Sequence, residues 1–391
     1  MRTIGVVSVG RSDYGIYLPI LKRIQNDNDL RLQLFAGGMH LRPEHGMTIK
    51  TIEADGFNVV EQIDMLTGSD TPQDIAASIG RGVIGFANAF NRFPPDILVV
   101  LGDRFEMYSA ALAALPFNIP VAHIHGGELT QGAIDDSLRH SMTKLSHLHF
   151  VATERYAKRV IQLGEEPWRV VVSGAPGLDH LDTITYQELN VLESRFGIDL
   201  SKPSLLVTFH PVTLEYEQVE AQIDAVLGAI QKSEHTVLFT SPNADSGGSI
   251  VLNKIRKYVE THPNSQLVDN LGTETYFSLM RCVTAMVGNS SSGIIEAPSF
   301  KLPVVNIGTR QDGRLRADNI IDVDCNEDAI LGGIKKAVGP SFGKQIGDMV
   351  NPYKQHGSAS EIIADHLKNI PLDQKLRVKS FYDLNEQTVA I

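Results

Sequence analysis

Residues 97–106 read ILVVLGDRFE, five large apolar residues followed by a glycine, an aspartate and the start of a helix-forming stretch. A parallel strand that is covered on both faces has this composition, because neither face needs polar residues. Similar runs alternate with amphipathic stretches through the first half of the chain. We expect strands at 4–9, 30–36, 97–101, 120–124 and 149–152, and helices at 17–26, 74–91, 106–115, 136–145 and 154–163. This alternation predicts a parallel α/β sheet.

The pattern restarts after residue 176. Residues 182–200 resemble a polar, mostly helical connector. Further strands are expected at 204–209, 235–240, 266–268, 285–288 and 304–307. We therefore predict an α/β protein with a first parallel-sheet domain over 1–180 and a second over 181–370; the tail at 371–391 would end the second domain or cross back to the first. Ligands of such sheets bind beyond the carboxyl ends of the strands, so the expected site is a cleft between the two domains.

Length and composition limit the function. The chain has 391 residues, enough for two domains, and its net charge is −11, a poor match for nucleic acid, although a small anion can bind locally. Two cysteines, Cys282 and Cys325, are too few for a disulfide scaffold or a four-cysteine zinc site. No apolar stretch approaches the roughly 18 residues of a membrane span, and the N-terminus resembles a buried strand rather than a signal peptide. We expect a soluble cytoplasmic protein.

Residues 10–15, GRSDYG, follow the first strand but match neither the G-x-G-x-x-G fingerprint nor a P-loop. A dinucleotide oxidoreductase and a P-loop NTPase are therefore disfavoured. Arg11, beside a helix start, is a candidate phosphate ligand. The alternative is a surface arginine in a tight turn.

An acidic cluster is predicted in the first half. Asp103 follows a strand, Glu128 follows the two glycines of HIHGGE at 123–128, and Asp135 comes shortly after. These three acids, with His125 as a neighbour, suit general acid–base catalysis. In the alternative, Asp103 and Asp135 only cap helices. His123 and His125 share one strand face and could bind a metal, but no third ligand lies at metal spacing, so we expect no metal.

The second half carries a candidate anion site. His210 precedes a proline at a strand end, where it is either a site residue or a buried hydrogen-bonded histidine. Residues 288–298, GNSSSGIIEAP, run from a strand into a helix start, which suits a diphosphate on Ser290, Ser291, Ser292 and Gly293. Glu296 would bind the ribose diol, and Arg314 would add positive potential. The alternative is a simple serine N-cap.

Seven motifs occur together in one order: GRSDYG at 10–15, GMHL at 38–41, LGDR at 101–104, HIHGGE at 123–128, RHSMTK at 139–144, GNSSSG at 288–293 and NIGTR at 306–310. This set resembles the hydrolysing UDP-N-acetylglucosamine 2-epimerases of sialic acid and legionaminic acid biosynthesis. The resemblance covers about residues 3–370.

The resemblance implies a GT-B architecture, two Rossmann-like domains facing a deep cleft, with neither a metal nor a redox cofactor. It places Ser290, Ser291 and Glu296 on the nucleotide site, His210 on the family's cleft histidine and Asp103 on its catalytic aspartate. Non-hydrolysing members and the animal bifunctional enzyme have Glu where this chain has His125, whereas the bacterial hydrolysing branch has His. We rank Glu128 above His125 as the acid or base, and we expect a homodimer or homotetramer.

The implied reaction converts UDP-N-acetylglucosamine to N-acetylmannosamine and UDP. The nucleotide leaves C1 and a proton leaves C2, giving a glycal, and water then adds while C2 is protonated on the opposite face. One alternative keeps this chemistry but uses a UDP- or GDP-linked 2,4-diacetamido-trideoxyhexose of the legionaminic route. A GT-B glycosyltransferase and a non-catalytic sugar-nucleotide sensor are further alternatives, and the acidic cluster argues against the first of these.

Overall fold

The computed structural model describes residues 1–68, 71–130, 134–242, 247–268 and 271–384. It divides the chain into two compact units. The first unit consists of Met1–Glu128, Asp135–Asp179 and the chain from Tyr353 onward. The second unit consists of Leu129–Ile134 and His180–Pro352.

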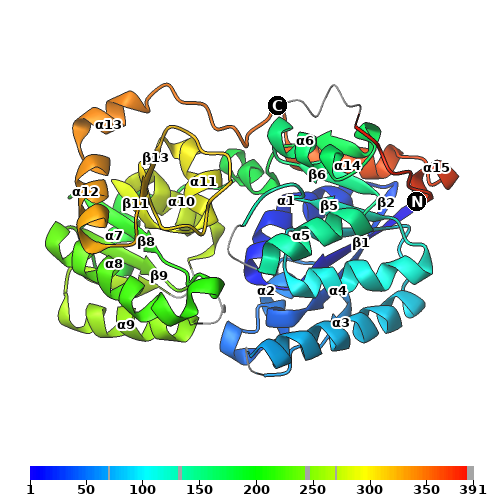
Figure 1. Cartoon of the computed structure of the whole chain (residues 1–391), viewed down its shortest axis with the longest axis horizontal. Coiled ribbons are helices and arrows are strands. Elements are labelled where there is room, and N and C mark those ends of the chain that lie inside the picture. The colour runs from blue at the N-terminus through cyan, green and yellow to red at the C-terminus, as the bar shows by residue number, and fades with distance from the viewer. Residues whose placement is uncertain (69–70, 131–133, 243–246, 269–270, 385–391) are drawn as a thin grey trace. The chain divides into compact units, whose positions relative to one another are not determined.

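The first unit is built on a seven-stranded parallel sheet (Figure 1). Its strands are β1 (Arg2–Ser8), β2 (Leu30–Gly37), β3 (Val59–Ile63), β4 (Ile97–Leu101), β5 (Val121–Ile124), β6 (Leu148–Val151) and β7 (Val170–Val172). They run in the order β3-β2-β1-β4-β5-β6-β7. The order reverses between β1 and β4, the topological switch point where ligands of such sheets bind.

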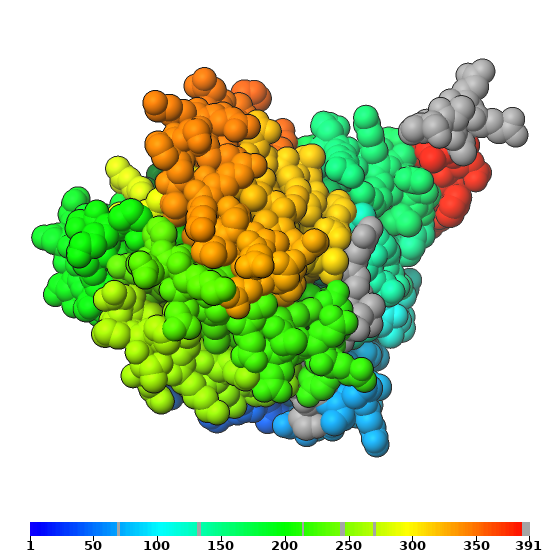
Figure 2. All heavy atoms as spheres, turned by 60° about the vertical axis from the view of Figure 1, so that its left-hand side comes forward, coloured from blue at the N-terminus to red at the C-terminus, as the bar shows by residue number. Residues whose placement is uncertain are grey.

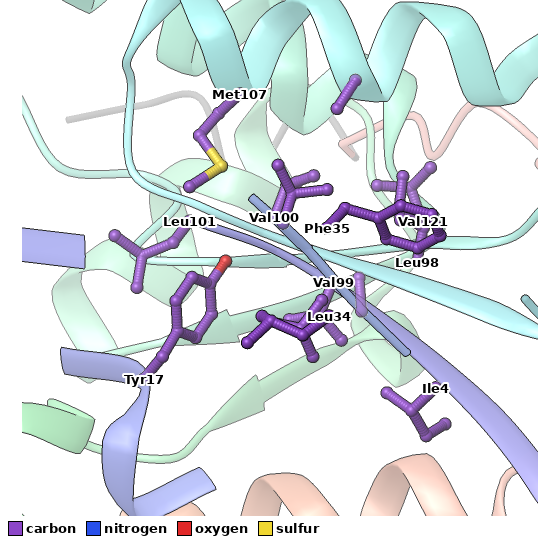
Figure 3. Packing of buried hydrophobic residues seen from close by; sticks show 14 of the residues in the cluster. Ile4, Tyr17, Leu34, Phe35, Leu98, Val99, Val100, Leu101, Met107 and Val121 are labelled. Atoms are coloured by element: carbon purple, nitrogen blue, oxygen red, sulfur yellow. The ribbon is translucent and has the colours of Figure 1, made fainter. Parts of the chain in front are cut away.

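Helices cover this sheet. They are α1 (Arg11–Asn26), α2 (Ile49–Ala54), α3 (Pro72–Arg92), α4 (Phe105–Ala114), α5 (Ile134–Leu145), α6 (Glu154–Gln162), α14 (Ala359–Asn369) and α15 (Gln374–Arg377). Thr71 and Thr153 begin α3 and α6, where their side chains accept hydrogen bonds from main-chain N–H groups of the first turn. Figure 3 shows the core that results, in which Val99 and Leu101 of β4 lie between Tyr17 of α1 and Met107 of α4.

The second unit repeats the design with six parallel strands in the order β10-β9-β8-β11-β12-β13. The strands are β8 (Ser204–Thr208), β9 (Thr236–Thr240), β10 (Ser265–Val268), β11 (Ala285–Gly288), β12 (Val304–Ile307) and β13 (Ile320–Val323). The helices are α7 (Leu189–Phe196), α8 (Val219–Ser233), α9 (Gly248–Thr261), α10 (Gly272–Cys282), α11 (Ser291–Ile295), α12 (Glu327–Ala337) and α13 (Pro340–Gln345). Here the switch point lies between β8 and β11.

Short 3₁₀ turns join several of these elements. They are η1 (Gly38–Leu41), η2 (Pro43–His45), η3 (Leu115–Phe117), η4 (Pro167–Arg169), η5 (Pro176–Asp182), η6 (Thr213–Gln218) and η7 (Ala297–Phe300). The connector expected to be mostly helical over 182–200 is α-helical only along α7.

The sequence prediction of two parallel α/β sheets is confirmed, and all ten expected strands are present. Three strands were missed, namely β3, β7 and β13, and each lies at a sheet edge. Edge strands are often short, and here polar residues interrupt β3 and β13 while β7 has only three residues. Four helices begin earlier than expected: α1 starts at Arg11, α3 at Pro72, α4 at Phe105 and α5 at Ile134.

The chain returns to the first unit at Tyr353, before the boundary at 370 that the sequence suggested. The Tyr353 hydroxyl lies 2.8 Å from that of Tyr156, and α14 packs against α1. Residues 371–384 then form a C-terminal strap on the same unit, drawn in red in Figure 2. Buried Arg169 donates to three of its main-chain carbonyls, and Lys379 of the strap donates to Glu165.

Candidate active site

The carboxyl ends of β4 and β5 carry the predicted acids of the first unit. Asp103 follows β4 and pairs with Arg139, a residue of α5 that is only 2 % exposed. A buried guanidinium stabilises a negative charge beside it. Asp135 lies half buried in the first turn of α5, one helical turn before Arg139, so both residues lie on one face of that helix.

Glu128 pairs with His125, whose Nδ1 lies 2.6 Å from the Glu128 Oε1. Both side chains are buried. His125 has a φ of 63°, a conformation that costs a residue with a Cβ about 1–3 kcal/mol, and its main-chain N–H donates to Phe150. Backbone strain of this kind is concentrated at functional sites, because only there is it worth maintaining.

Two glycines follow His125 because the loop passes close to α6. At Gly127, with a φ of 76°, an added Cβ would lie 2.6 Å from the Tyr156 carbonyl oxygen. The Gly127 carbonyl itself accepts a hydrogen bond from Arg159 of α6. The left-handed backbone of this turn is thus adopted by His125 and Gly127.

His123 holds the turn that precedes Asp103. Its Nε2 lies 2.8 Å from the Gly102 carbonyl oxygen and its Nδ1 lies 3.3 Å from the Thr143 hydroxyl. Burial lowers the pKa of His123 to about 3, so the ring is neutral. Among the described residues, no group of three histidines, cysteines or acids is placed to hold a metal ion.

A second buried polar cluster, which sequence reasoning missed, lies beside these acids. Burial raises the pKa of Asp13, in the first turn of α1, to about 7, although Arg104 opposes the shift. Arg104 in turn pairs with buried Glu106 at 3.1 Å. His40 hydrogen-bonds Ser8 at 2.8 Å, and burial lowers its pKa to about 4. Arg11 lies exposed at the start of α1.

The serine turn that was predicted to bind an anion lies at the end of β11 in the second unit. Ser290 caps α11, and its hydroxyl accepts from the Ser292 N–H at 3.3 Å. Ser291 and Ser292 are half exposed. Helix α11 has only five residues and passes into η7, so its dipole is weaker than the sequence suggested. Gly293 has a packing reason to be glycine, because an added Cβ would lie 2.8 Å from Val304.

Glu296 and Arg314 both follow this serine turn in the chain. Glu296 ends α11 half exposed, and its negative charge helps to raise the pKa of Tyr276, which burial raises most. The Arg314 Nε donates to the Leu129 carbonyl at 3.3 Å. Tyr276 was not singled out from the sequence, because a tyrosine inside a helix resembles a core residue.

His210 lies just beyond β8 and is buried. Burial, and then the charge of Arg310, hold its pKa well below the ordinary value, so the imidazole is neutral. Its main chain is held by Asn289, which follows β11. Asn289 was missed because an amide after a strand gives no charge signal.

The structure thus pairs Asp103 with Arg139 and His125 with Glu128 in the first unit, and places Asp135 on the same helix as Arg139. In the second unit it joins the main chain of His210 to Asn289, which precedes the serine turn, and Glu296 follows that turn. Neutral histidines and charge-paired carboxylates can exchange protons with a bound molecule. None of the helices in the described ranges is long and apolar enough to cross a membrane.

Comparison with known proteins identifies relatives across nearly the whole chain. A family model described as UDP-N-acetylglucosamine 2-epimerase matches residues 22–368. The chain is 40% identical to the GDP/UDP-N,N'-diacetylbacillosamine 2-epimerase (hydrolyzing) of Campylobacter jejuni, over 98% of this chain and 99% of that one. It is 37% identical to the UDP-N,N'-diacetylbacillosamine 2-epimerase (hydrolyzing) of Legionella pneumophila, over 96% and 98%. It is 36% identical to the polysialic acid biosynthesis protein P7 of Escherichia coli, over 100% of both.

Solved structures agree on the fold. A UDP-N-acetylglucosamine 2-epimerase from Neisseria meningitidis, solved with UDP-N-acetylglucosamine bound, matches with a TM-score of 0.78 at 19% identity. A second, from Listeria monocytogenes, gives 0.80 at 16%. The matches cover 94% of this chain in both cases, and 99% and 96% of the respective solved chains. The two Rossmann-like units are therefore those of a GT-B protein.

Proposed function

This chain belongs to the UDP-N-acetylglucosamine 2-epimerase family, and we propose that it is a hydrolysing 2-epimerase of UDP- or GDP-linked N,N'-diacetylbacillosamine. The observation that carries the substrate is the naming of the two relatives at 40% and 37% identity, both hydrolysing enzymes for that sugar. These relatives therefore favour the diacetamido sugar over UDP-N-acetylglucosamine, the substrate that the sequence motifs predict.

The proposed reaction begins with cleavage of the bond between C1 and the diphosphate oxygen. Because C2–H is a weak acid, this cleavage leads, and the transition state resembles an oxocarbenium ion. A base removes the C2 proton to give the glycal, and the nucleoside diphosphate leaves with the electron pair of the broken bond. Water then adds its oxygen to C1 while an acid protonates C2 on the opposite face, releasing the free 2-epimer.

We assign the proton transfers to Asp103 and Glu128. The charge pair with Arg139 keeps Asp103 suited to accept a proton, and the contact with His125 gives Glu128 a proton-sharing partner. Asp135 lies on the same face of α5 as Arg139 and takes part in the cluster. Neutral His210 is proposed to contact the sugar from the second unit.

The leaving diphosphate requires hydrogen-bond donors where charge develops. We assign this role to the hydroxyls of Ser290 and Ser291, to the main chain at Ser292 and Gly293, and to the cations Arg11 and Arg314. Glu296 would accept from the ribose hydroxyls, as acidic residues do in related nucleotide sites.

A second candidate substrate is UDP-N-acetylglucosamine, because the matching family is described by that sugar nucleotide. The deciding experiment supplies UDP-N,N'-diacetylbacillosamine, its GDP counterpart and UDP-N-acetylglucosamine separately in deuterium oxide, and identifies the products by NMR. We expect the nucleoside diphosphate and the free 2-epimer of the diacetamido sugar with deuterium at C2. Turnover of UDP-N-acetylglucosamine alone would contradict the proposed substrate, and no turnover of all three would contradict the proposed reaction.

A further inference from the structure

Strand pairing between β8 and β11 ends just where the predicted site begins. The last ladder contact there is the hydrogen bond from the Asn289 N–H to the Thr208 carbonyl, at 3.1 Å. The two strands are in close contact at this point, since a Cβ on Gly288 would lie 1.9 Å from that same carbonyl oxygen. Pro211 follows His210 and has no N–H, so β8 cannot continue by main-chain pairing.

Beyond this last ladder contact, the side chain of Asn289 hydrogen-bonds the main chain of His210. Its Oδ1 accepts from the His210 N–H at 2.7 Å, and its Nδ2 donates to the His210 carbonyl at 2.8 Å. The amide of asparagine offers a neutral donor and a neutral acceptor on two neighbouring atoms, which matches the C=O and N–H of one residue's main chain. Both residues are buried, so no bulk water can replace these bonds.

The main chain of Asn289 is also held. Its carbonyl oxygen accepts from the Gln311 Nε2 at 2.7 Å and from the Arg310 Nη1 at 3.3 Å. Gln311 and Arg310 lie in the loop after β12, and Ser290 is the next residue along the chain. Asn289 therefore joins His210, the serine turn and the loop after β12.

We propose that Asn289 is a positioning residue for the 2-epimerase reaction. It holds the main chain of His210, so that the His210 imidazole contacts the sugar while the serine turn binds the diphosphate. This inference rests on the proposed function. Asn289 does not itself act on the substrate. Its effect is on the rate of the chemical step rather than on nucleotide binding.

The test compares Asn289→Ala with Asn319→Ala. Asn319 is a matched control because it is a buried asparagine of the same unit whose Nδ2 also donates to a main-chain carbonyl, that of Leu302, at 2.8 Å. It precedes β13, at the amino edge of the sheet. We expect kcat of Asn289→Ala to fall about ten- to a hundredfold, the usual cost of a small misplacement. Its affinity for UDP should stay within about threefold, as a change confined to the chemical step requires. Asn319→Ala should keep the natural kcat.

A second measurement needs no activity. The ring signals of His210, followed by NMR in histidine-labelled protein without ligand, should shift in Asn289→Ala and stay in place in Asn319→Ala. Equal kcat in the two variants, a parallel loss of kcat and UDP affinity, or unmoved His210 signals would overturn the role of Asn289. Failure of the natural protein to turn over any sugar nucleotide would instead contradict the proposed function.

Asn289→Asp is the second variant if the alanine variant does not fold. It keeps the size of the side chain and the acceptor for the His210 N–H but loses the donor to the carbonyl. We expect the same shift of the His210 signals and a fall in kcat. Natural kcat with unmoved signals in this variant also contradicts the inference.

Discussion

Asp103 pairs with buried Arg139, and Glu128 pairs with buried His125. If they carry the proton transfers, Asp103→Asn and Glu128→Gln keep the shape of the side chain and remove its ionisation. We expect each to lower kcat by about a hundredfold or more, the scale of lost general acid–base catalysis. UDP affinity, measured by calorimetry, should persist.

The control for these variants is Asp136→Asn. Asp136 is next to Asp135 on α5, and its carboxylate lies 3.6 Å from the Nε2 of His140. It should leave kcat near the natural value. Near-normal rates in Asp103→Asn and Glu128→Gln, together with inactive Asp135→Asn or His125→Ala, would show that the chemistry belongs to other residues of the cluster. Glycal accumulating in one variant alone would mark the residue that serves the second step.

Glu296 is the residue on which the ribose assignment depends. Replacing it by alanine removes a charged acceptor for a neutral diol, and we expect UDP binding to weaken by about 1.5–3 kcal/mol. Calorimetry with UDP measures this loss, and circular dichroism checks the fold. Glu260→Ala, on the exposed side of α9, is the matched control and should bind UDP normally. Unchanged affinity in Glu296→Ala would remove the residue from the nucleotide site.

Single residues were predictable from the sequence where a charged side chain follows a strand, as Asp103 does. Arg139, Asp13 and Asn289 were not, and the reasons are physical. Arg139 and Asp13 lie inside helices, where charged residues usually face water, and only the fold buries them. Asn289 acts through amide geometry, which composition does not reveal.

At the scale of elements, the loop between β5 and α5 depends on Gly127. A residue with a side chain would have to adopt the left-handed conformation there, and its Cβ would clash with the Tyr156 carbonyl oxygen of α6. We expect Gly127→Ala to lower the free energy of unfolding by about 2–5 kcal/mol, because left-handed backbone costs about 1–2 kcal/mol and overpacking about 1–3. Urea denaturation measures the change.

Gly56→Ala supplies the comparison. Gly56 has a φ of 85°, but nothing lies within 4 Å of an added Cβ. It should therefore show only the backbone cost of about 1–2 kcal/mol. Equal losses in the two variants would mean that the approach of the loop to α6 adds nothing to stability.

Elements were predictable in proportion to their burial. β4 is fully buried and is a continuous apolar run, and β5 is equally buried with His123 as its one polar residue, whereas edge strand β3 includes the polar pair Glu61 and Gln62. Helix α1 begins at Arg11, whereas the apolar pattern predicts a start at residue 17, because its first turn carries the polar residues Arg11, Ser12 and Asp13. Polar first turns are usual, since free N–H groups gather there.

At the scale of the whole molecule, one buried acid helps Arg169 to hold the C-terminal strap. Glu165 is fully buried and accepts from Lys144 at 2.6 Å, His149 at 3.0 Å and Lys379 of the strap at 2.9 Å. Although burial alone raises the pKa of Glu165, these hydrogen bonds lower it to about 2. Removing its charge leaves the ammonium groups of Lys379 and Lys144, which are 18 % and 41 % exposed, without their anion, so Glu165→Gln should cost about 1–3 kcal/mol at pH 7.

The pH dependence follows from the sign of this shift. A carboxyl whose pKa falls on folding, here from 4.5 to about 2, stabilises the fold above its unfolded pKa. The difference in the free energy of unfolding between the natural protein and Glu165→Gln should be largest above about pH 5 and should shrink as the pH falls through about 2. Glu166→Gln, whose side chain is 24 % exposed, should cost less. A constant difference at all pH values would contradict the ionic role of Glu165.

The return of the chain at Tyr353 also sets an order of events during synthesis. A nascent chain that has reached residue 352 contains every residue of the second unit. It still lacks Ile363, Leu367 and Leu376, three members of the first unit's apolar core. The ribosome therefore delivers the inserted unit complete, while the first unit keeps an open hydrophobic face until residue 376 has been added.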